Sequence, residues 1–111
     1  MKLISLRVDG ADAGDIRTMA LNLRGRVNQD QAGAAVLVGV KDGKVAVVAA
    51  TNDLARDRGV RANDLLAAVM PLVGGRGGGK DDVAQGGGTD ASRIDEALAA
   101  ARHAVARAAG A

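Results

Sequence analysis

The sequence has no phenylalanine, tyrosine or tryptophan, so a hydrophobic core must be built from Val, Leu, Ile, Met and Ala. Cysteine is also absent, which excludes disulfides and thiolate-based zinc or redox sites. His103 is the only histidine, so a His-rich metal site and a Cys–His nucleophile are excluded as well. No apolar run approaches the ~20 residues of a membrane span, and residues 1–8 are too short and mixed for a signal peptide. A cytoplasmic location is therefore expected.

What the chain does contain is typical of one globular domain. Its 111 residues are 48% apolar and 25% charged, which is too short for two domains and too apolar for a disordered chain. The formal net charge is only +2, and the distribution of charge says more than the sum. Arg17 and Arg24 lie in a stretch without acids, and so do Arg76 and Lys80. Each of these clusters is either a binding surface or a solvated face.

Hydrophobic periodicity predicts the first half of the fold. Residues 2–8 alternate as a half-buried strand does. A helix is expected from about Asp12, with an apolar stripe on one face and with Arg17 and Arg24 on a different, outward face. Two β-branched runs flank the dipeptide 42–43, Asp-Gly, a preferred two-residue hairpin turn. Because both faces of these runs are apolar, the hairpin is expected at the centre of a sheet covered by helices.

The second half reads as helix, glycine-rich loop and helix. Residues 62–73 repeat their apolar positions at helical spacing, and Pro71 should kink or end this helix near Met70. One short strand is expected at residues 83–85. The predicted fold is a small α+β single domain over residues 1–111, in the order β-α-β-β-α-(Gly-rich loop, short strand)-α, with helices packed on a mixed sheet.

The last helix is expected to run to the end of the chain. Asp90 or Ser92 can cap its N-terminus, since both side chains accept hydrogen bonds from free backbone N–H groups. The apolar stripe of this helix starts at Ile94 and leaves His103 on the other side, where it is expected to be exposed.

Half of the sixteen glycines fall in one stretch between the two C-terminal helices. They are Gly74, Gly75, Gly77, Gly78, Gly79, Gly86, Gly87 and Gly88. Ordering eight glycines costs roughly 4–8 kcal/mol relative to alanine. A fold of ordinary stability, ~5–15 kcal/mol, would seldom carry that cost without a ligand or a tight backbone crossing.

Three hypotheses fit this stretch. A phosphate-binding loop would use Gly74, Gly79 and Lys80, but Asp81 stands where the magnesium-binding hydroxyl is needed, and a helix precedes the loop where a strand should. A flexible linker is the second hypothesis, although charged and apolar residues interrupt the glycines. The third is an ordered anion site, in which glycines adopt positive φ and consecutive N–H groups form a nest.

The motif GGRGGGKDDVAQGGGTDASRIDEAL, residues 74–98, resembles the C-terminal domain of bacterial alanyl-tRNA synthetases, the module called DHHA1. The family pattern is a glycine pair, a basic residue, three glycines, a second basic residue, a short acidic stretch, Ala-Gln, further glycines and a capped helix. The upstream strand, helix, hairpin and the segment MPLVGG are similar to the family too, so the resemblance covers essentially the whole chain.

The resemblance implies that the chain is a fragment of a longer enzyme. The parent would ligate alanine to tRNA with ATP and magnesium and would edit mischarged tRNA in a zinc-dependent domain, so no catalytic residue, metal ligand or cofactor is expected here. The DHHA1 domain would grip the outer corner of tRNA(Ala), where the D- and T-loops meet, and would couple aminoacylation to editing. The other domains of the parent are expected partners, and the resemblance allows a homodimer.

The site residues implied by the resemblance lie in the glycine stretch. They are Gly74, Gly75, Arg76, Gly77, Gly78, Gly79, Lys80, Gln85, Gly86, Gly87 and Gly88, and the clustered Arg17 and Arg24 are added from their charge. Because aromatic rings are absent, RNA recognition would use shape, flat main chain and arginine planes. Two alternatives stay open: a dimerisation or partner-binding module with tight backbone crossings, and the substrate-binding domain of a DHH phosphoesterase. Thr89 counts against the second, since those enzymes have a histidine after the glycine triplet.

Overall fold

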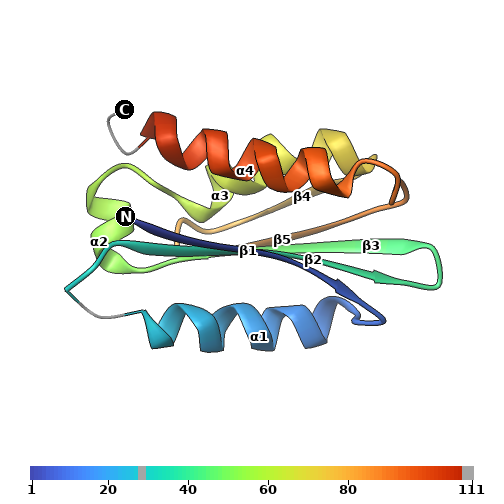
Figure 1. Ribbon diagram of the computed structural model, residues 1–111, viewed down its shortest axis with the longest axis horizontal. Helices are drawn as coiled ribbons and strands as arrows, with labels where there is room; N and C mark the ends of the chain where they lie inside the picture. Colours follow the sequence, from blue (N-terminus) through green and yellow to red (C-terminus); the bar gives the residue numbers. More distant parts are fainter. Residues whose placement is uncertain (28–29, 109–111) are drawn as a thin grey trace.

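A mixed five-stranded sheet runs through the centre of the computed structural model, which describes residues 1–27 and 30–108 (Figure 1). The strands are β1 (Lys2–Asp9), β2 (Gly33–Lys41), β3 (Lys44–Thr51), β4 (Arg76–Gly79) and β5 (Val83–Gly88). Their order in the sheet is β1-β2-β3-β5-β4. β1 pairs parallel with β2, and the other neighbours are antiparallel. The predicted α+β single-domain fold with a mixed sheet is confirmed.

Helices cover both faces of the sheet (Figure 1). Helix α1 (Ala13–Arg26) lies on one face, and α3 (Ala62–Val69) and α4 (Ile94–Ala108) lie on the other. A short helix, α2 (Asp53–Asp57), and a 3-10 turn, η1 (Met70–Val73), complete the described elements. Among the described residues, no helix is long and apolar enough to cross a membrane.

The hairpin of β2 and β3 forms the core, as its two apolar faces predict. On one face, Leu37 and Val48 are fully buried against Ile16 of α1. On the other face, alternate residues of the same strands, such as Val47, pack with Leu66 of α3 as part of a larger cluster. Asp42 and Gly43 make the turn, both with positive φ.

The predicted helix limits follow from local chemistry. Asp12 caps α1: its carboxylate accepts a hydrogen bond from the N–H of Asp15, and the Asp15 carboxylate accepts one from the N–H of Asp12. Pro71 ends α3, and the chain continues as the 3-10 turn. Before α4, Asp90 accepts hydrogen bonds from the N–H and the hydroxyl of Ser92, so these two residues form a turn that precedes the first helical residue by two positions. The sequence did not predict α2.

The glycine-rich segment is a β-hairpin, which corrects the expectation of a loop. Residues 76–79 and 83–88 form the strands β4 and β5 and extend the sheet beyond β3. The linker hypothesis is therefore wrong. The anion nest is wrong in its geometry as well, because only Gly74 of the eight glycines has a positive φ and the main chain of β5 pairs with strands on both sides.

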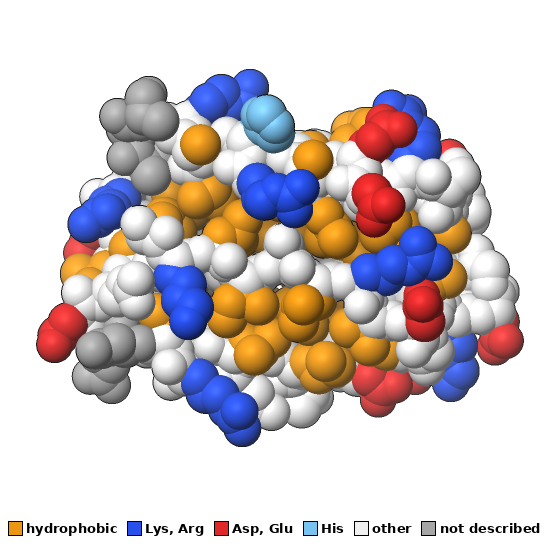
Figure 2. Space-filling model, viewed as in Figure 1, with side chains coloured by type: hydrophobic (Ala, Val, Ile, Leu, Met, Phe, Trp, Pro, Cys, Tyr) orange, Lys and Arg blue, Asp and Glu red, His pale blue; other side chains and the backbone are white. Residues whose placement is uncertain are grey.

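Apolar side chains are exposed along the opposite edge of the sheet. Figure 2 shows them between α1 and α4, where β1 forms the edge. Leu6 of β1 is the most prominent of them, with 42% of its surface exposed.

Candidate nucleic-acid interface

Most glycines of the β4–β5 hairpin are required by tight packing within the fold. A Cβ atom on Gly75 would lie 2.0 Å from the carbonyl oxygen of Gly87, and one on Gly77 would lie 2.4 Å from the Cα atom of Gly86. Similar collisions with backbone atoms would occur at Gly79, Gly86 and Gly88. Close approach of the two chains therefore explains these glycines without any ligand.

Gly78 and Gly87 differ from the others. A Cβ atom on Gly78 would meet no atom closer than Oδ1 of Asn63 at 3.9 Å, and one on Gly87 none closer than the oxygen of Val45 at 3.7 Å. Packing within the fold therefore does not exclude a side chain at either position. Both glycines are exposed and line hollows of the surface.

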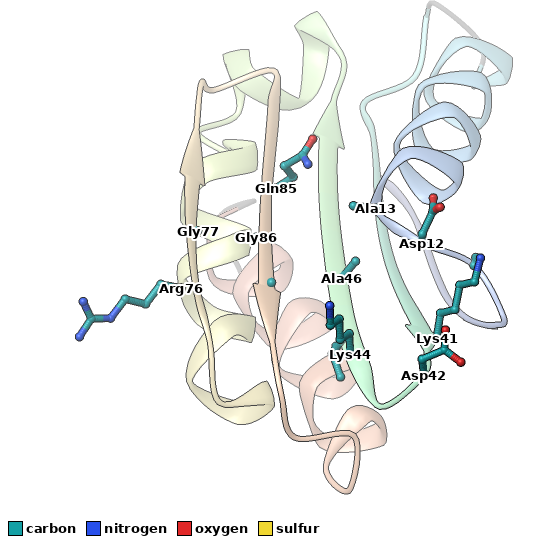
Figure 3. A pocket seen from close by; sticks show the side chains of 13 residues that line it. Asp12, Ala13, Lys41, Asp42, Lys44, Ala46, Arg76, Gly77, Gln85 and Gly86 are labelled. Atoms are coloured by element: carbon teal, nitrogen blue, oxygen red, sulfur yellow. The ribbon is translucent and has the colours of Figure 1, made fainter.

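Helix α1 covers only part of its face of the sheet. Two neighbouring hollows lie on the uncovered part of this face, over the glycine strands β4 and β5. The larger has a volume of about 630 Å³ and lies between the start of α1, the end of the β2–β3 hairpin and the glycine strands (Figure 3). The smaller has a volume of about 330 Å³ and is lined by Arg17, Lys80 and neighbouring residues of the β4–β5 hairpin. Gln85 lines both. We call the exposed main chain of Gly78 and Gly87, with Ala46 of β3, the glycine floor.

Arg17 and Arg24 of α1 reach the β4–β5 hairpin. Nη1 of Arg17 donates a hydrogen bond of 2.7 Å to Oε1 of Gln85. Nη1 of Arg24 donates a longer one, 3.4 Å, to the carbonyl oxygen of Asp82. The two arginines share one face, as predicted, but this face turns toward the hairpin and not only to solvent. The structure thus brings together the arginines near the N-terminus and the glycine stretch.

Other basic residues surround the hollows. Lys80 lines the smaller hollow at the turn between β4 and β5. Arg76 lines the larger one, and its side chain extends away from the sheet past β4 (Figure 3). Lys41 and Lys44 flank the turn of the β2–β3 hairpin and line the larger hollow as well. These two lysines were not predicted as site residues, because only the register of β3 against β5 brings them near the glycines.

Asp12 lines the larger hollow, and its pKa is shifted. The hydrogen bond from the N–H of Asp15 is the main cause that holds the pKa of Asp12 below its ordinary value, and the charge of Lys41 acts in the same direction. Its carboxylate therefore stays ionised and remains hydrogen-bonded to the first turn of α1, beside the larger hollow.

The turn between β4 and β5 is fastened to the core by Thr51, the last residue of β3. Its buried hydroxyl donates a hydrogen bond of 2.7 Å to the carbonyl oxygen of Asp81, and its N–H donates one of 2.9 Å to that of Asp82. Lys80 is the residue just before this anchored pair, so its Cα position is fixed although its side chain is exposed.

The remaining described residues add no reactive group to this surface. His103 is exposed on α4, on the other face of the sheet, as the sequence predicts. Within the described parts of the chain, no three His, Cys, Asp or Glu side chains are grouped to hold a metal ion. What the surface offers is a flat glycine floor, amide and guanidinium donors, and a rim on which the cationic side chains outnumber the carboxylates of Asp12, Asp42 and Asp82. Such a surface can accept an anionic ligand with flat faces.

These features define a small α+β domain with a glycine-floored surface that carries more cationic than acidic side chains. The family model of the DHHA1 domain matches residues 1–107, and the chain belongs to this family. The resemblance stated from the sequence is thereby confirmed.

Relatives of known name agree with this assignment. The chain is 65% identical over 98 residues to an alanine–tRNA ligase from Nocardioides sp., covering 88% of this chain, and 47% identical over 102 residues to one from Nocardia farcinica, covering 92%. The chain spans only 11% of the length of either relative. Among solved structures, it is similar to the C-Ala domain of Aquifex aeolicus alanyl-tRNA synthetase, with a TM-score of 0.82, 24% identity and coverage of 93% of this chain and 89% of that one. This likeness shows the shared fold.

Proposed function

We propose that this chain is the non-catalytic tRNA-binding domain of an alanine–tRNA ligase. It would hold the outer corner of tRNA(Ala) and couple aminoacylation to editing in the cytoplasm. ATP, magnesium and zinc would be bound by other domains of the parent enzyme, which are the partners of this one. The names of the relatives and the membership in the DHHA1 family support the parent enzyme, and the glycine-floored surface supports the role in RNA binding.

The observation that carries the proposal is the uncrowded glycine at the larger hollow, Gly87. It has room for a side chain, so its lack of one leaves a flat main-chain surface that a ligand can approach. The main chain of Gly78 lines the smaller hollow, although a Cβ atom there would lie nearest to Asn63 of α3. Arg24 and Lys80 stand beside this surface, where they can contact phosphates, and Arg17 is hydrogen-bonded to Gln85 at its edge. A folded RNA presents both elements, a phosphate backbone and flat base pairs, without needing aromatic side chains from the protein.

Fluorescence anisotropy with end-labelled, folded tRNA tests this proposal. The variant Arg76→Glu/Lys80→Glu reverses one charge beside β4 and one at the smaller hollow, and it should weaken binding by at least about tenfold, or ~1.4 kcal/mol. The matched control is Arg102→Glu/Arg107→Glu, which makes the same change of net charge at exposed positions of α4. It should change the affinity by less than about twofold, because its charges lie on the other face of the sheet. Equal losses in both variants, or no binding by the wild type, would contradict the proposal.

Dimerisation is a second candidate function, favoured by the exposed apolar edge at β1. An edge strand can pair with the same strand of a second copy. Sedimentation velocity of the wild type and of Leu6→Lys tests it: a dimer that the lysine dissociates supports this function, and a wild-type monomer at all concentrations excludes it.

A further inference from the structure

The hydrogen bond between Arg17 and Gln85 fixes how the Gln85 amide is oriented. A guanidinium group has donors and no acceptor, so only the oxygen of the Gln85 amide can face Arg17. The structure shows this arrangement: Nη1 of Arg17 donates a hydrogen bond of 2.7 Å to Oε1 of Gln85. The NH₂ group of the same amide must then point away from Arg17, and its donors are left for another partner.

Gln85 is placed where a ligand on the glycine floor would meet it. Among the described residues, it is the one that lines both hollows. In the sheet it stands opposite Gly78 on one side and Val48 on the other, so its main chain is engaged within the fold. Its side chain is partly exposed and, in Figure 3, points from β5 toward β3 across the larger hollow. Any interaction of Gln85 with a ligand must therefore use the side-chain amide.

From this geometry we infer that Arg17 is a positioning residue: it holds the Gln85 amide so that its NH₂ group donates to an acceptor on the edge of a base lying on the glycine floor. The inference rests on the proposed function in RNA binding. A neutral amide donor suits a base edge, whereas phosphates are held by the cationic side chains around the hollows. When RNA covers this surface and excludes water, the bond between Arg17 and Gln85 strengthens because the local dielectric constant falls.

A double-mutant cycle with folded tRNA tests the inference. Gln85→Ala removes the donor and should weaken binding about tenfold, which corresponds to ~1.4 kcal/mol. Arg17→Ala should weaken it to a similar extent, and the double variant should be no weaker than Gln85→Ala alone, because Arg17 acts through Gln85. Arg26→Ala removes an exposed arginine from the same helix and is the control for loss of charge. Thermal unfolding of each variant checks that the fold is retained.

The salt dependence of binding supplies the readout that separates positioning from direct contact. A side chain that binds a phosphate contributes about 0.7–0.9 to the slope of log K against log salt, and its removal lowers the slope by that amount. Arg17→Ala should leave the slope equal to that of Arg26→Ala. In ¹⁵N spectra, the side-chain NH₂ signals of Gln85 should shift on addition of tRNA to the wild type and should shift less in Arg17→Ala.

A conservative change at Gln85 gives an independent arm. Gln85→Glu keeps the size and the bond to Arg17 but replaces the NH₂ donors by an acceptor, so it should weaken binding at least as much as Gln85→Ala. The control is Asn22→Asp, which makes the same amide-to-acid change at an exposed position of α1 outside the hollows. It should change the affinity for tRNA by less than about twofold.

The outcomes separate the inference from the proposed function. Multiplicative losses in the cycle, together with a lower salt slope for Arg17→Ala, would show that Arg17 binds RNA directly, and the inference is then wrong while the RNA role stands. Full binding by Gln85→Ala overturns the inference as well. Absence of tRNA binding by the wild type overturns the proposed function itself.

Discussion

Arg17 and Gln85 are 68 positions apart in the sequence, yet a hydrogen bond of 2.7 Å joins Nη1 of the first to Oε1 of the second. The bond links α1 to β5, the strand at which the helix cover of this sheet face ends. It therefore marks the border between the buried half of the face and the glycine floor. Residues from the first and second halves of the chain meet at this border, which is why the candidate site needs the whole fold and not the glycine motif alone.

The two kinds of glycine in the hairpin should respond differently to alanine. Gly87→Ala should leave the free energy of unfolding unchanged or raise it by ~0.4–1 kcal/mol, because its φ is negative and its Cβ has room. The same Cβ stands on the glycine floor and should weaken tRNA binding about tenfold by lifting the ligand off the main chain. Urea unfolding and anisotropy titration measure the two effects.

Gly77→Ala is the matched control for that prediction. Its Cβ would lie 2.4 Å from the Cα atom of Gly86, so the strands must separate, and the domain should lose ~1–3 kcal/mol of stability. A Gly87→Ala variant that is as destabilised as Gly77→Ala would show that both glycines are needed only for packing. That result would contradict the proposal that the glycine floor binds RNA.

Lys44 should contribute to RNA binding although the sequence does not mark it. It is the first residue of β3, the strand that pairs with β5, and it lines the larger hollow together with Gly87. Lys44→Ala should weaken tRNA binding several-fold at low salt and lower the salt slope by about 0.9. A slope identical to that of the wild type would place Lys44 outside the interface.

The sequence predicts the architecture well because its signals are local. The hairpin around Asp42 and Gly43, the start of α1 near Asp12 and the break at Pro71 depend on near neighbours, and the structure confirms each of them. The family resemblance rests on an ordered motif, and the family match confirms it.

The conformation of the glycine segment could not be predicted in the same way. Strand propensity disfavours glycine, so residues 76–79 and 83–88 give no periodic signal of their own. They become strands because β3 offers an edge and because the absence of side chains allows β4 and β5 to approach closely. For the same reason, most of these glycines were assigned to a ligand site from the sequence, although close packing of the strands requires them. The sequence also gives no signal that distinguishes Gly78 and Gly87 from the others.

Acid should destabilise the helix cap at Asp12 in a defined direction. The bond from the N–H of Asp15 lowers the pKa of the Asp12 carboxyl in the folded state below its value in the unfolded chain. Its stabilising contribution is therefore complete above the unfolded pKa and is lost as the pH falls through the folded pKa. Asp12→Asn keeps a capping group that does not titrate. The wild type should thus lose more stability than Asp12→Asn between about pH 5 and pH 2, as measured by thermal unfolding at each pH. Parallel pH profiles of the two proteins would contradict this assignment.

Thr51 should stabilise the domain through the turn that presents Lys80. Thr51→Val keeps the shape of the side chain but removes the buried hydroxyl that donates 2.7 Å to the carbonyl oxygen of Asp81. The loss of this bond, and of the longer one of 3.4 Å that the hydroxyl accepts from Nη1 of Arg56, should lower the free energy of unfolding by ~1 kcal/mol. Thr18→Val makes the same substitution on the exposed surface of α1 and should change stability by less than ~0.5 kcal/mol. Because Ala62 also donates to the Asp81 oxygen, the turn should stay folded but open more often, and amide exchange of residues 80–82 should accelerate in Thr51→Val alone. Unchanged exchange there would mean that the pairing of β5 with β3, and not Thr51, holds Lys80 at the edge of the glycine floor.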